Sequence, residues 1–356
     1  MRSTILKIIL LSILLYLFFY SIILLGTAFG HFGKDFVAKI ISATDRPLTG
    51  LFIGILSTGI IQSSSTTTSI VVALVGGNIL SLQNAIPIIM GANIGTTITN
   101  TLVSFGHITR KTEFSRAISA AVLHDSFNIL SVIILFPIQY YTNFLGISAQ
   151  FIAKIFEGIG GLTFISPIKT IVNPLISLTE KITQGSGTVM VIIAFVCILL
   201  VIKYFSKVVK SLVAHKAEVF FNQYVFRAYY SSMIFGMIFT AIVQSSSITT
   251  SLIIPLAGAG ILTLNQIYPY TLGANMGTTI TAILASFSTG SITAVTIAFA
   301  HLLFNVFGII IFTPLKNIPI FLAKNYSALV EKSRVVPVIF IFLIFFIIPI
   351  FFIYVL

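Results

Sequence analysis

The chain alternates long apolar runs with short polar loops, and most of these runs are long enough to cross a lipid bilayer. A spanning helix needs about 20 mainly apolar residues. The pattern predicts spanning helices near residues 3–30, 82–105, 113–139, 187–209, 263–287, 291–313 and 335–356. We therefore expect an all-α integral membrane protein.

Two further apolar segments, 48–78 and 230–260, are broken in the middle by Gln-Ser-Ser-Ser. Each segment is long enough for two half-helices with a polar turn between them. We predict that each forms a re-entrant hairpin, which dips into the membrane and returns to the same side.

These broken segments belong to an internal repeat. Residues Gly59–Ser69 align with Ala241–Ser251, and Gly91–Thr99 align with Gly273–Thr281. Both pairs have the same offset of 182 residues, and 16 of the 20 aligned positions are identical. Two motifs held at one spacing over this distance indicate a duplication.

A third pair of motifs, His124-x-x-Phe127-Asn128 and His301-x-x-Phe304-Asn305, has an offset of 177. The basic loop from His107 to Lys111 in the first copy accounts for the difference of five residues. The predicted organisation is a first repeat at 1–139 with its hairpin at 48–78, an external linker with interfacial helices at 140–182, a second repeat at 183–315 with its hairpin at 230–260, and a cytoplasmic connector plus an extra C-terminal helix at 316–356.

The number of crossings between the hairpins predicts how the two copies are oriented. Three full crossings separate them, and an odd number inverts the second copy relative to the first. With a cytoplasmic N-terminus, this topology places 14 of the 20 Lys and Arg inside the cell, as the positive-inside rule requires. The predicted fold is thus two inverted repeats, each with a re-entrant hairpin and an unwound transmembrane helix.

Composition agrees with a membrane location. Apolar residues make up 57% of the chain and charged residues 8%, against about 25% charged in a typical soluble domain. The net charge of +12 could suggest nucleic acid, but the basic residues are scattered in short loops, so we expect no nucleic-acid partner. Cys197 has no second cysteine to pair with. The first apolar stretch is long for a signal peptide, so we expect a retained helix.

The two polar turns carry the candidate chemistry. A helix broken at membrane depth frees N–H and C=O groups, which must face protein or a watery cavity. Half-helix N-termini attract anions, and hydroxyls and amides can donate to an oxyanion or coordinate a hard cation. No Arg or Lys lies in either turn, so a bound anion needs a co-bound cation, which suggests sodium symport. The candidate substrate residues are Gln62, Ser63, Ser64, Ser65 and Thr66, with Gln244, Ser245, Ser246 and Ser247.

The Gly-Ala-Asn-x-Gly-Thr-Thr segments are predicted to complete the site. Their glycines, Gly91, Gly95, Gly273 and Gly277, would permit local unwinding. Uncharged oxygens around such a break suit a weakly held Na⁺. The candidate sodium ligands are Asn93, Thr96, Thr97, Asn275, Thr278 and Thr279.

Other intramembrane polar residues have a structural interpretation beside the functional one. Ser and Thr in membrane helices often bond the preceding turn or pack between helices. The duplication at both breaks favours a functional role for the two turns, whereas the His and Asn pairs favour helix locking. Asp125 is the one acid in the interior of a predicted span, and its repeat mate is Leu302, so any role is asymmetric. The candidate supporting residues are His124, Asp125, Asn128, His301 and Asn305.

With these motifs, nearly the whole chain resembles the type II sodium-phosphate cotransporter family. The resemblance rests on the two Gln-Ser-Ser-Ser turns, the two Gly-Ala-Asn-x-Gly segments, His124-Asp125-x-Phe127-Asn128 and Glu113-Phe114-x-Arg116-Ala117. It implies import of inorganic phosphate with Na⁺ across the cell (inner or plasma) membrane, no cofactor, and an elevator-like movement of the hairpin core. Thr66 aligns with Ile248, so the two halves differ in their ligands.

Other functions stay open at this point. The nearest is a sodium-coupled carrier of a dicarboxylate or an acidic amino acid, but such a substrate usually calls for an Arg, and none lies between Gly236 and Pro314. An intramembrane hydrolase is disfavoured because adjacent His124 and Asp125 cannot form a triad, so we expect no enzyme. A uniform channel would not need duplicated breaks. The sequence leaves open whether the protein forms a homodimer.

Overall fold

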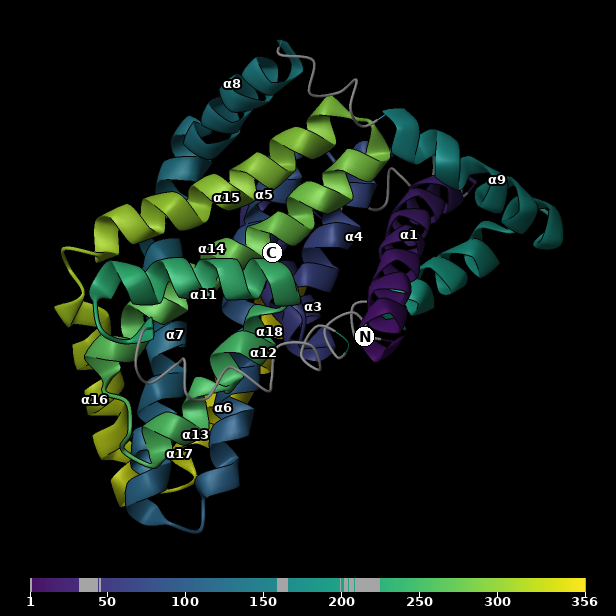
Figure 1. The fold of residues 1–356 in the computed structure, drawn as a ribbon. Coiled ribbons are helices and arrows are strands. Elements are labelled where there is room, and N and C mark those ends of the chain that lie inside the picture. The colour runs from purple at the N-terminus through teal and green to yellow at the C-terminus, as the bar shows by residue number, and fades with distance from the viewer. Residues whose placement is uncertain are drawn as a thin grey trace.

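The computed structural model describes residues 2–31, 44, 46–158, 166–198, 200, 201, 204, 208 and 225–355. Within these residues the chain is all-helical (Figure 1). The helices of the first half are α1 (Arg2–Gly30), α3 (Pro47–Ile61), α4 (Ser64–Gly76), α5 (Leu82–Gly95), α6 (Ile98–Ser104), a 3₁₀ turn (Phe105–His107), α7 (Lys111–Thr142), α8 (Phe144–Gly158) and α9 (Ser166–Ile182).

The second half repeats much of this order. A helix at Gly187–Ile198 precedes α11 (Tyr229–Val243), α12 (Ser246–Ser251), α13 (Ile253–Gly258), α14 (Leu264–Thr289), α15 (Ile292–Phe312), α16 (Asn317–Lys332), α17 (Val336–Phe342), a π-helical turn (Leu343–Ile347) and α18 (Ile348–Val355). In Figure 1, α1 and α9 lie at one side and α7 and α16 at the other, with α3 and α4 between them.

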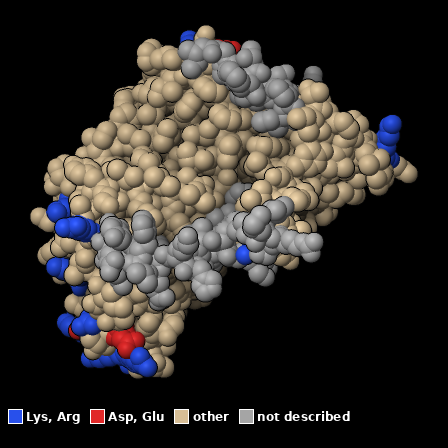
Figure 2. Space-filling model, in the orientation of Figure 1, with Lys and Arg blue, Asp and Glu red and all other residues tan. Residues whose placement is uncertain are grey.

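Five of the described helices are long and apolar enough to cross a membrane. They are Leu6–Leu25, Leu82–His107, Lys111–Thr142, Ile292–Phe312 and Val336–Val355. In Figure 2 the charged residues gather at the ends of the molecule, and a broad uncharged surface lies between them. The predicted helix at 187–209 lies partly outside the described residues. Several of the basic residues counted for the positive-inside rule also lie outside them, including Lys34, Lys39, Lys203, Lys207 and Lys210.

Glycines let α3 lie against α5 with almost no side chain between the two backbones. A Cβ on Gly91 would lie 1.9 Å from the Leu51 carbonyl oxygen, and one on Gly54 would lie 2.0 Å from that of Ile88. The residue numbers rise together along both helices, so α3 and α5 run parallel. Small residues permit this close approach between membrane helices.

The same contacts recur 182 residues later between α11 and α14. A Cβ on Gly273 would lie 1.8 Å from the Met233 carbonyl oxygen, and one on Gly236 would lie 2.3 Å from that of Tyr270. Each of these four residues is the repeat mate of one in the first pair. The duplication read from the sequence is therefore a duplication of packing as well.

This packing corrects the prediction of an unwound helix at the Gly-Ala-Asn-x-Gly segments. α14 runs unbroken through Gly273 and Gly277, and all of its helical turns are kept. In the first copy the chain only loosens at Thr96 and Thr97, which remain in right-handed helical conformation. The glycines allow close contact between helices, and this contact does not require the helix to unwind.

The segment at 316–356 also differs from its prediction as a simple connector and helix. Residues Asn317–Lys332 form α16, which packs along α7. Its buried residues recur at helical spacing, which gives it one face for α7: Pro319, Ile320, Ala323, Ser327 and Val330. The predicted C-terminal helix is present and packs on α3, where the rings of Phe52 and Phe352 stack at 4.6 Å.

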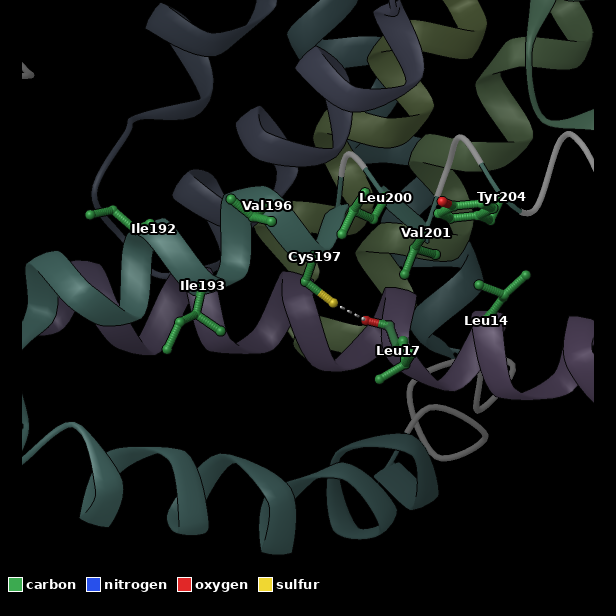
Figure 3. Close-up of a pocket in the computed structure, with 9 residues that line it drawn as sticks. All are labelled: Leu14, Leu17, Ile192, Ile193, Val196, Cys197, Leu200, Val201 and Tyr204. Atoms are coloured by element: carbon green, nitrogen blue, oxygen red, sulfur yellow. Dashed lines mark hydrogen bonds between the residues drawn. The ribbon is translucent and has the colours of Figure 1, made fainter.

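α1, the first helix of the predicted first repeat, packs against the helix that includes Gly187–Ile198, which is the first helix of the predicted second repeat and so its repeat mate. The Cys197 thiol points at the Leu17 carbonyl oxygen, 3.8 Å away, and Leu14 lies toward Val201 (Figure 3). The two helices thus run in opposite directions. An apolar hollow of about 540 Å³ lies between them, and its lining is aliphatic apart from Cys197 and Tyr204.

Candidate functional site

The first Gln-Ser-Ser-Ser turn is a sharp break between two helices. α3 ends at Gln62, whose backbone is left-handed with φ 57° and ψ 28°. Ser63 then adopts an extended conformation and caps α4, because its hydroxyl accepts the Thr66 N–H at 3.2 Å. Serine is among the preferred residues at this capping position. The polar turn therefore forms for local reasons that the sequence encodes.

The second turn has the same backbone shape. Gln244 has φ 56° and ψ 30°, and Ser245 caps α12 by accepting the Ile248 N–H at 3.3 Å. The helix after the turn differs, since α4 continues for 13 residues while α12 ends after six. Pro255 follows one turn later and cannot donate to the Ser251 carbonyl, which accounts for the interruption at Leu252.

The two turns meet in space although 182 residues separate them. The Ser65 hydroxyl donates to the backbone carbonyl of Gln244 at 2.9 Å. This hydrogen bond brings the two turns into direct contact.

The two turns are unequally exposed. Gln62 is exposed and Ser63 is half-buried, whereas Gln244 is only 9% exposed. The residues just inside each turn are buried in both copies: Ser64, Ser65, Thr66, Ser246 and Ser247. The site thus opens past the first turn more than past the second.

The hydroxyls near the first turn have defined orientations. Ser63 Oγ accepts both the N–H and the hydroxyl of Thr66, the latter at 3.0 Å, which leaves the Ser63 proton for a third partner. In the second copy Ile248 replaces Thr66 and its side chain packs against apolar neighbours. The two turns therefore differ in polarity at this position.

The candidate sodium ligands lie beside the two turns. A Cβ on Gly95 would lie 2.6 Å from Thr58, four residues before Gln62, and Gly277 has the equivalent relation to Thr240. The hydroxyls of Thr96 and Thr278 donate to carbonyls one turn back, at 3.0 and 3.1 Å. Thr279 likewise bonds its own helix at 2.7 Å. Thr97 differs, because its hydroxyl lies near both the Ile94 carbonyl, at 2.8 Å, and the Asp125 carboxylate. A hydroxyl that donates to its own helix presents only lone pairs outward, which suits a cation better than an anion.

His124 joins three helices through hydrogen bonds. Its Nδ1 lies 3.0 Å from the Asn100 side-chain nitrogen, and its Nε2 lies 2.6 Å from Asn275 Oδ1. The Asn275 amide then donates to Asn128 Oδ1 at 2.7 Å. At the other end, the Thr250 hydroxyl donates to Asn100 Oδ1 at 2.9 Å. This chain links α12, α6, α7 and α14.

The corresponding network around His301 has fewer hydrogen bonds. The Asn305 amide donates to Asn93 Oδ1 at 3.4 Å, which repeats the Asn275–Asn128 contact at greater length. Neither ring nitrogen of His301 has a hydrogen-bond partner within the described part of the chain. Ala282 stands where the first copy has Asn100, so the partner that His124 uses is missing.

Asp125 is fully buried on α7 and accepts hydrogen bonds from two threonines. These are Thr97, one of the candidate sodium ligands, and Thr101, the latter at 3.4 Å. The carboxyl group therefore lies beside the loosened end of α5. Its mate Leu302 can make no such contact, so this arrangement exists in one half only.

Residues 17–166 and 197–318 match the family model described as Na⁺/Pi-cotransporter. This chain belongs to the Na⁺/Pi-cotransporter family. Both matched segments contain one Gln-Ser-Ser-Ser turn and one Gly-Ala-Asn-x-Gly segment, so the family match covers both halves of the site.

Curated relatives cover almost the whole chain. It is 31% identical to the sodium-dependent phosphate transport protein 2B of Homo sapiens, over 96% of this chain and 64% of that protein. It is 30% identical to the 2A protein of Ovis aries, over 97% of this chain and 67% of the relative. The chain thus spans less than two thirds of the length of the human 2B protein. No solved structure is a significant match.

Four buried threonines near the turns were missed by sequence reasoning. Thr58 donates to Thr67 across the first break at 2.9 Å, and Thr240 and Thr249 make the same contact across the second at 2.7 Å. These pairs tie each arm of a broken helix to the other. The offset of 182 relates the two pairs and could have identified them. Asn100 was also missed, because its repeat mate is the apolar Ala282 and the duplication therefore did not point to it.

Proposed function

We propose that this protein is a sodium-coupled symporter that imports inorganic phosphate. The observation that carries the proposal is the contact between the two turns, where Ser65 meets Gln244. Neither turn contains Lys or Arg, so a bound phosphate would leave its charge to be balanced by Na⁺. The printed names of the 2A and 2B relatives, sodium-dependent phosphate transport proteins, support the same substrate and ion.

In this proposal the turns bind phosphate through hydrogen bonds. Ser63 has a proton left for an outside acceptor, and Gln62 and Gln244 add amide donors. The first N–H groups of α4 have no partner within the helix and would add to these. α12 has only six residues, so its share comes mainly from the side chains of Ser245, Ser246 and Ser247.

Sodium would bind beside the phosphate, at the threonine-rich segments of α5 and α14. The outward lone pairs of Thr96, Thr278 and Thr279 support this assignment. Asn93 and Asn275 are each buried next to these threonines. We assign supporting roles to His124, Asp125, Asn128, His301 and Asn305, which connect the surrounding helices.

We further propose an inverted topology with re-entrant hairpins at α3–α4 and α11–α13. The opposite direction of α1 and its repeat mate supports inversion. Arg110 and Arg46 also lie at opposite ends of α7, as the proposed cytoplasmic N-terminus requires. The close α3–α5 and α11–α14 pairs would each move as one body, which supports an elevator-like alternating access.

The test is uptake of radiolabelled phosphate into proteoliposomes with an inward Na⁺ gradient, with K⁺ in place of Na⁺ as the control. We expect uptake only with Na⁺, and a raised KM for phosphate in both Ser64→Ala and Ser246→Ala. Equal uptake in Na⁺ and K⁺ would exclude sodium coupling. Inhibition by a dicarboxylate without any phosphate uptake would point to a different anion.

A further inference from the structure

His301 on α15 is a buried imidazole that lacks a hydrogen-bond partner. Its side chain is fully enclosed, and neither ring nitrogen meets a donor or acceptor among the residues that the structure describes. A neutral imidazole has one N–H to donate and one nitrogen that accepts, and buried polar groups are almost always hydrogen-bonded. His301 therefore needs a partner from outside this set of residues.

The first copy shows what surrounds the equivalent imidazole. His124 Nδ1 lies 3.0 Å from the Asn100 side-chain nitrogen, and Asn100 Oδ1 accepts a hydrogen bond from the Thr250 hydroxyl at 2.9 Å. One asparagine side chain thus bridges a histidine and a threonine that belong to different helices.

In the second copy an alanine replaces this bridging asparagine. The offsets of 177 and 182 residues make His301, Ala282 and Thr68 the mates of His124, Asn100 and Thr250. All three mates are fully buried, and the helices that carry them, α15, α14 and α4, pack on one another. The histidine and the threonine are therefore kept, but the amide group between them is lost.

The packing of α4 on α14 supports Thr68 and Ala282 as neighbours. Two turns further along both helices, a Cβ on Gly76 would lie 2.8 Å from the side chain of Thr289. The Thr68 hydroxyl also has a weak attachment of its own, since its hydrogen bond to the Ser65 carbonyl is long, at 3.4 Å. It can therefore take a second partner on the side of Ala282.

We propose that an ordered water molecule takes the place of the Asn100 amide in the second copy, where it bridges His301 and Thr68. Alanine is smaller than asparagine by one amide group, which is room for about one water. The imidazole nitrogen and the hydroxyl supply two polar partners, the smallest number that usually holds a buried water. α4 of the first hairpin is then joined to α15 through water, whereas Asn100 joins α12 to α7 directly.

A coupling Na⁺ fits this place less well than water does. A hard cation takes several oxygen ligands, and His301 and Thr68 offer a single oxygen between them. The residues one turn away on α14 and α15, Ala285 and Ala298, are buried and apolar. A small uncharged ligand that both donates and accepts hydrogen bonds is therefore favoured.

Substitutions at Ala282 test whether the space and its polar partners exist. Ala282→Asn should restore the first-copy bridge, so we expect its thermal midpoint to rise or to stay within about 2 °C of the parent. Ala282→Leu fills the same space without hydrogen bonds and should lower the midpoint by about 4 °C. Reaction of the half-buried Cys197 thiol with a dye reports unfolding during heating.

Ala285→Asn is the matched control for the added amide. Ala285 lies one turn further along α14, is equally buried, and has the apolar Val103 as its mate. This variant should lose at least as much stability as Ala282→Leu, because its amide finds neither room nor partners. Equal losses in Ala282→Asn and Ala285→Asn would overturn the proposal.

The water itself is tested in a structure of the parent protein at a resolution that shows ordered solvent. We expect one density peak within hydrogen-bonding distance of both His301 and Thr68, replaced by the side-chain amide in Ala282→Asn. No peak there, or direct contact of His301 Nδ1 with another side chain, would overturn the proposal. A peak present in Na⁺ and lost in K⁺ would also overturn it and reassign the place to the cation.

Discussion

At the scale of single residues, Ser65 stands out because its hydrogen bond leaves its own turn. It ends on the Gln244 carbonyl, so one hydroxyl connects two segments that arose by duplication. Neighbouring hydroxyls such as those of Thr67 and Thr68 bond within their own segment instead. Ser65 therefore affects both halves of the proposed phosphate site at once.

We expect Ser65→Ala to raise the KM for phosphate about fivefold, because a hydrogen bond contributes about 1 kcal/mol. The measurement is the initial rate of phosphate uptake in proteoliposomes. Ser69→Ala on the same helix is the control, since the buried Ser69 hydroxyl has no partner among the described residues and its loss should change little. Equal KM values for both variants would contradict a role for the Ser65 contact.

A second prediction concerns the two asparagine pairs. Asn275 and Asn128 approach to 2.7 Å, whereas their mates Asn93 and Asn305 approach only to 3.4 Å. Double-mutant cycles to alanine should give a coupling of about 0.6 kcal/mol for the first pair, the average for hydrogen bonds between membrane helices. The second pair should couple less. Unfolding in denaturing detergent measures both, and stronger coupling in the second pair would refute this ranking.

At the scale of helices, the closest contacts are between backbones. Gly273→Ala would place a Cβ 1.8 Å from the Met233 carbonyl oxygen, so α11 and α14 must separate. We expect a loss of about 3 kcal/mol or more, at the upper end for overpacked cores. Gly106→Ala is the control, because nothing lies within 4 Å of its added Cβ.

Cys197 provides the measurement for both glycine variants. It is the only cysteine in the chain and is half-buried, so a thiol-reactive dye reports unfolding during heating. The midpoint of the Gly273→Ala variant should fall by several degrees, while that of Gly106→Ala stays near the parent value. Equal midpoints would show that the helices adapt without cost.

Much of the helix order could be predicted from apolar runs, and both turns could be predicted from the polar break and serine capping. The continuity of α14 could not. Glycines such as Gly273 and Gly277 indicate either a flexible backbone or close packing. Only the structure of the neighbouring helix shows which of the two applies. The side chain of Met237 gives no hint that its carbonyl lies against Gly277.

The contacts of the candidate site were predictable only where the residues belong to duplicated motifs. Residues of the duplicated motifs, such as Ser65, were identified because each copy marks the other. Asn100 became visible only through its partners, His124 and Thr250, which lie on helices distant in sequence. α16 was missed because its polar residues, including Ser327 and Lys324, hide an amphipathic pattern from a search for long apolar runs.

At the scale of the whole molecule, the proposed topology places the two ends of α7 on opposite sides of the membrane. Tyr141 lies at one end, and α16 reaches the other, where Glu331 accepts a hydrogen bond from Ser115 at 2.6 Å. In a Cys197→Ala background, Tyr141→Cys should react with an impermeant thiol reagent added outside cells. Arg334→Cys should react only after permeabilisation.

The two positions are a matched pair, since both are exposed. Labelling of both from the same side would contradict a spanning α7. Labelling with the sides reversed would keep the fold but turn the proposed N-terminus outward. Either result is independent of whether phosphate is transported.

The unequal exposure of the two turns has a consequence for the proposed transport cycle. Gln62 and Gln244 have nearly the same backbone angles, yet Gln62 is exposed and Gln244 is almost fully buried. Two inverted copies can exchange roles, so one conformation predicts its opposite. In the opposite conformation of the proposed cycle, Gln244 would be hydrated and Gln62 enclosed. Under the proposed mechanism, the structure would represent one half of the cycle, and the internal duplication would describe the other.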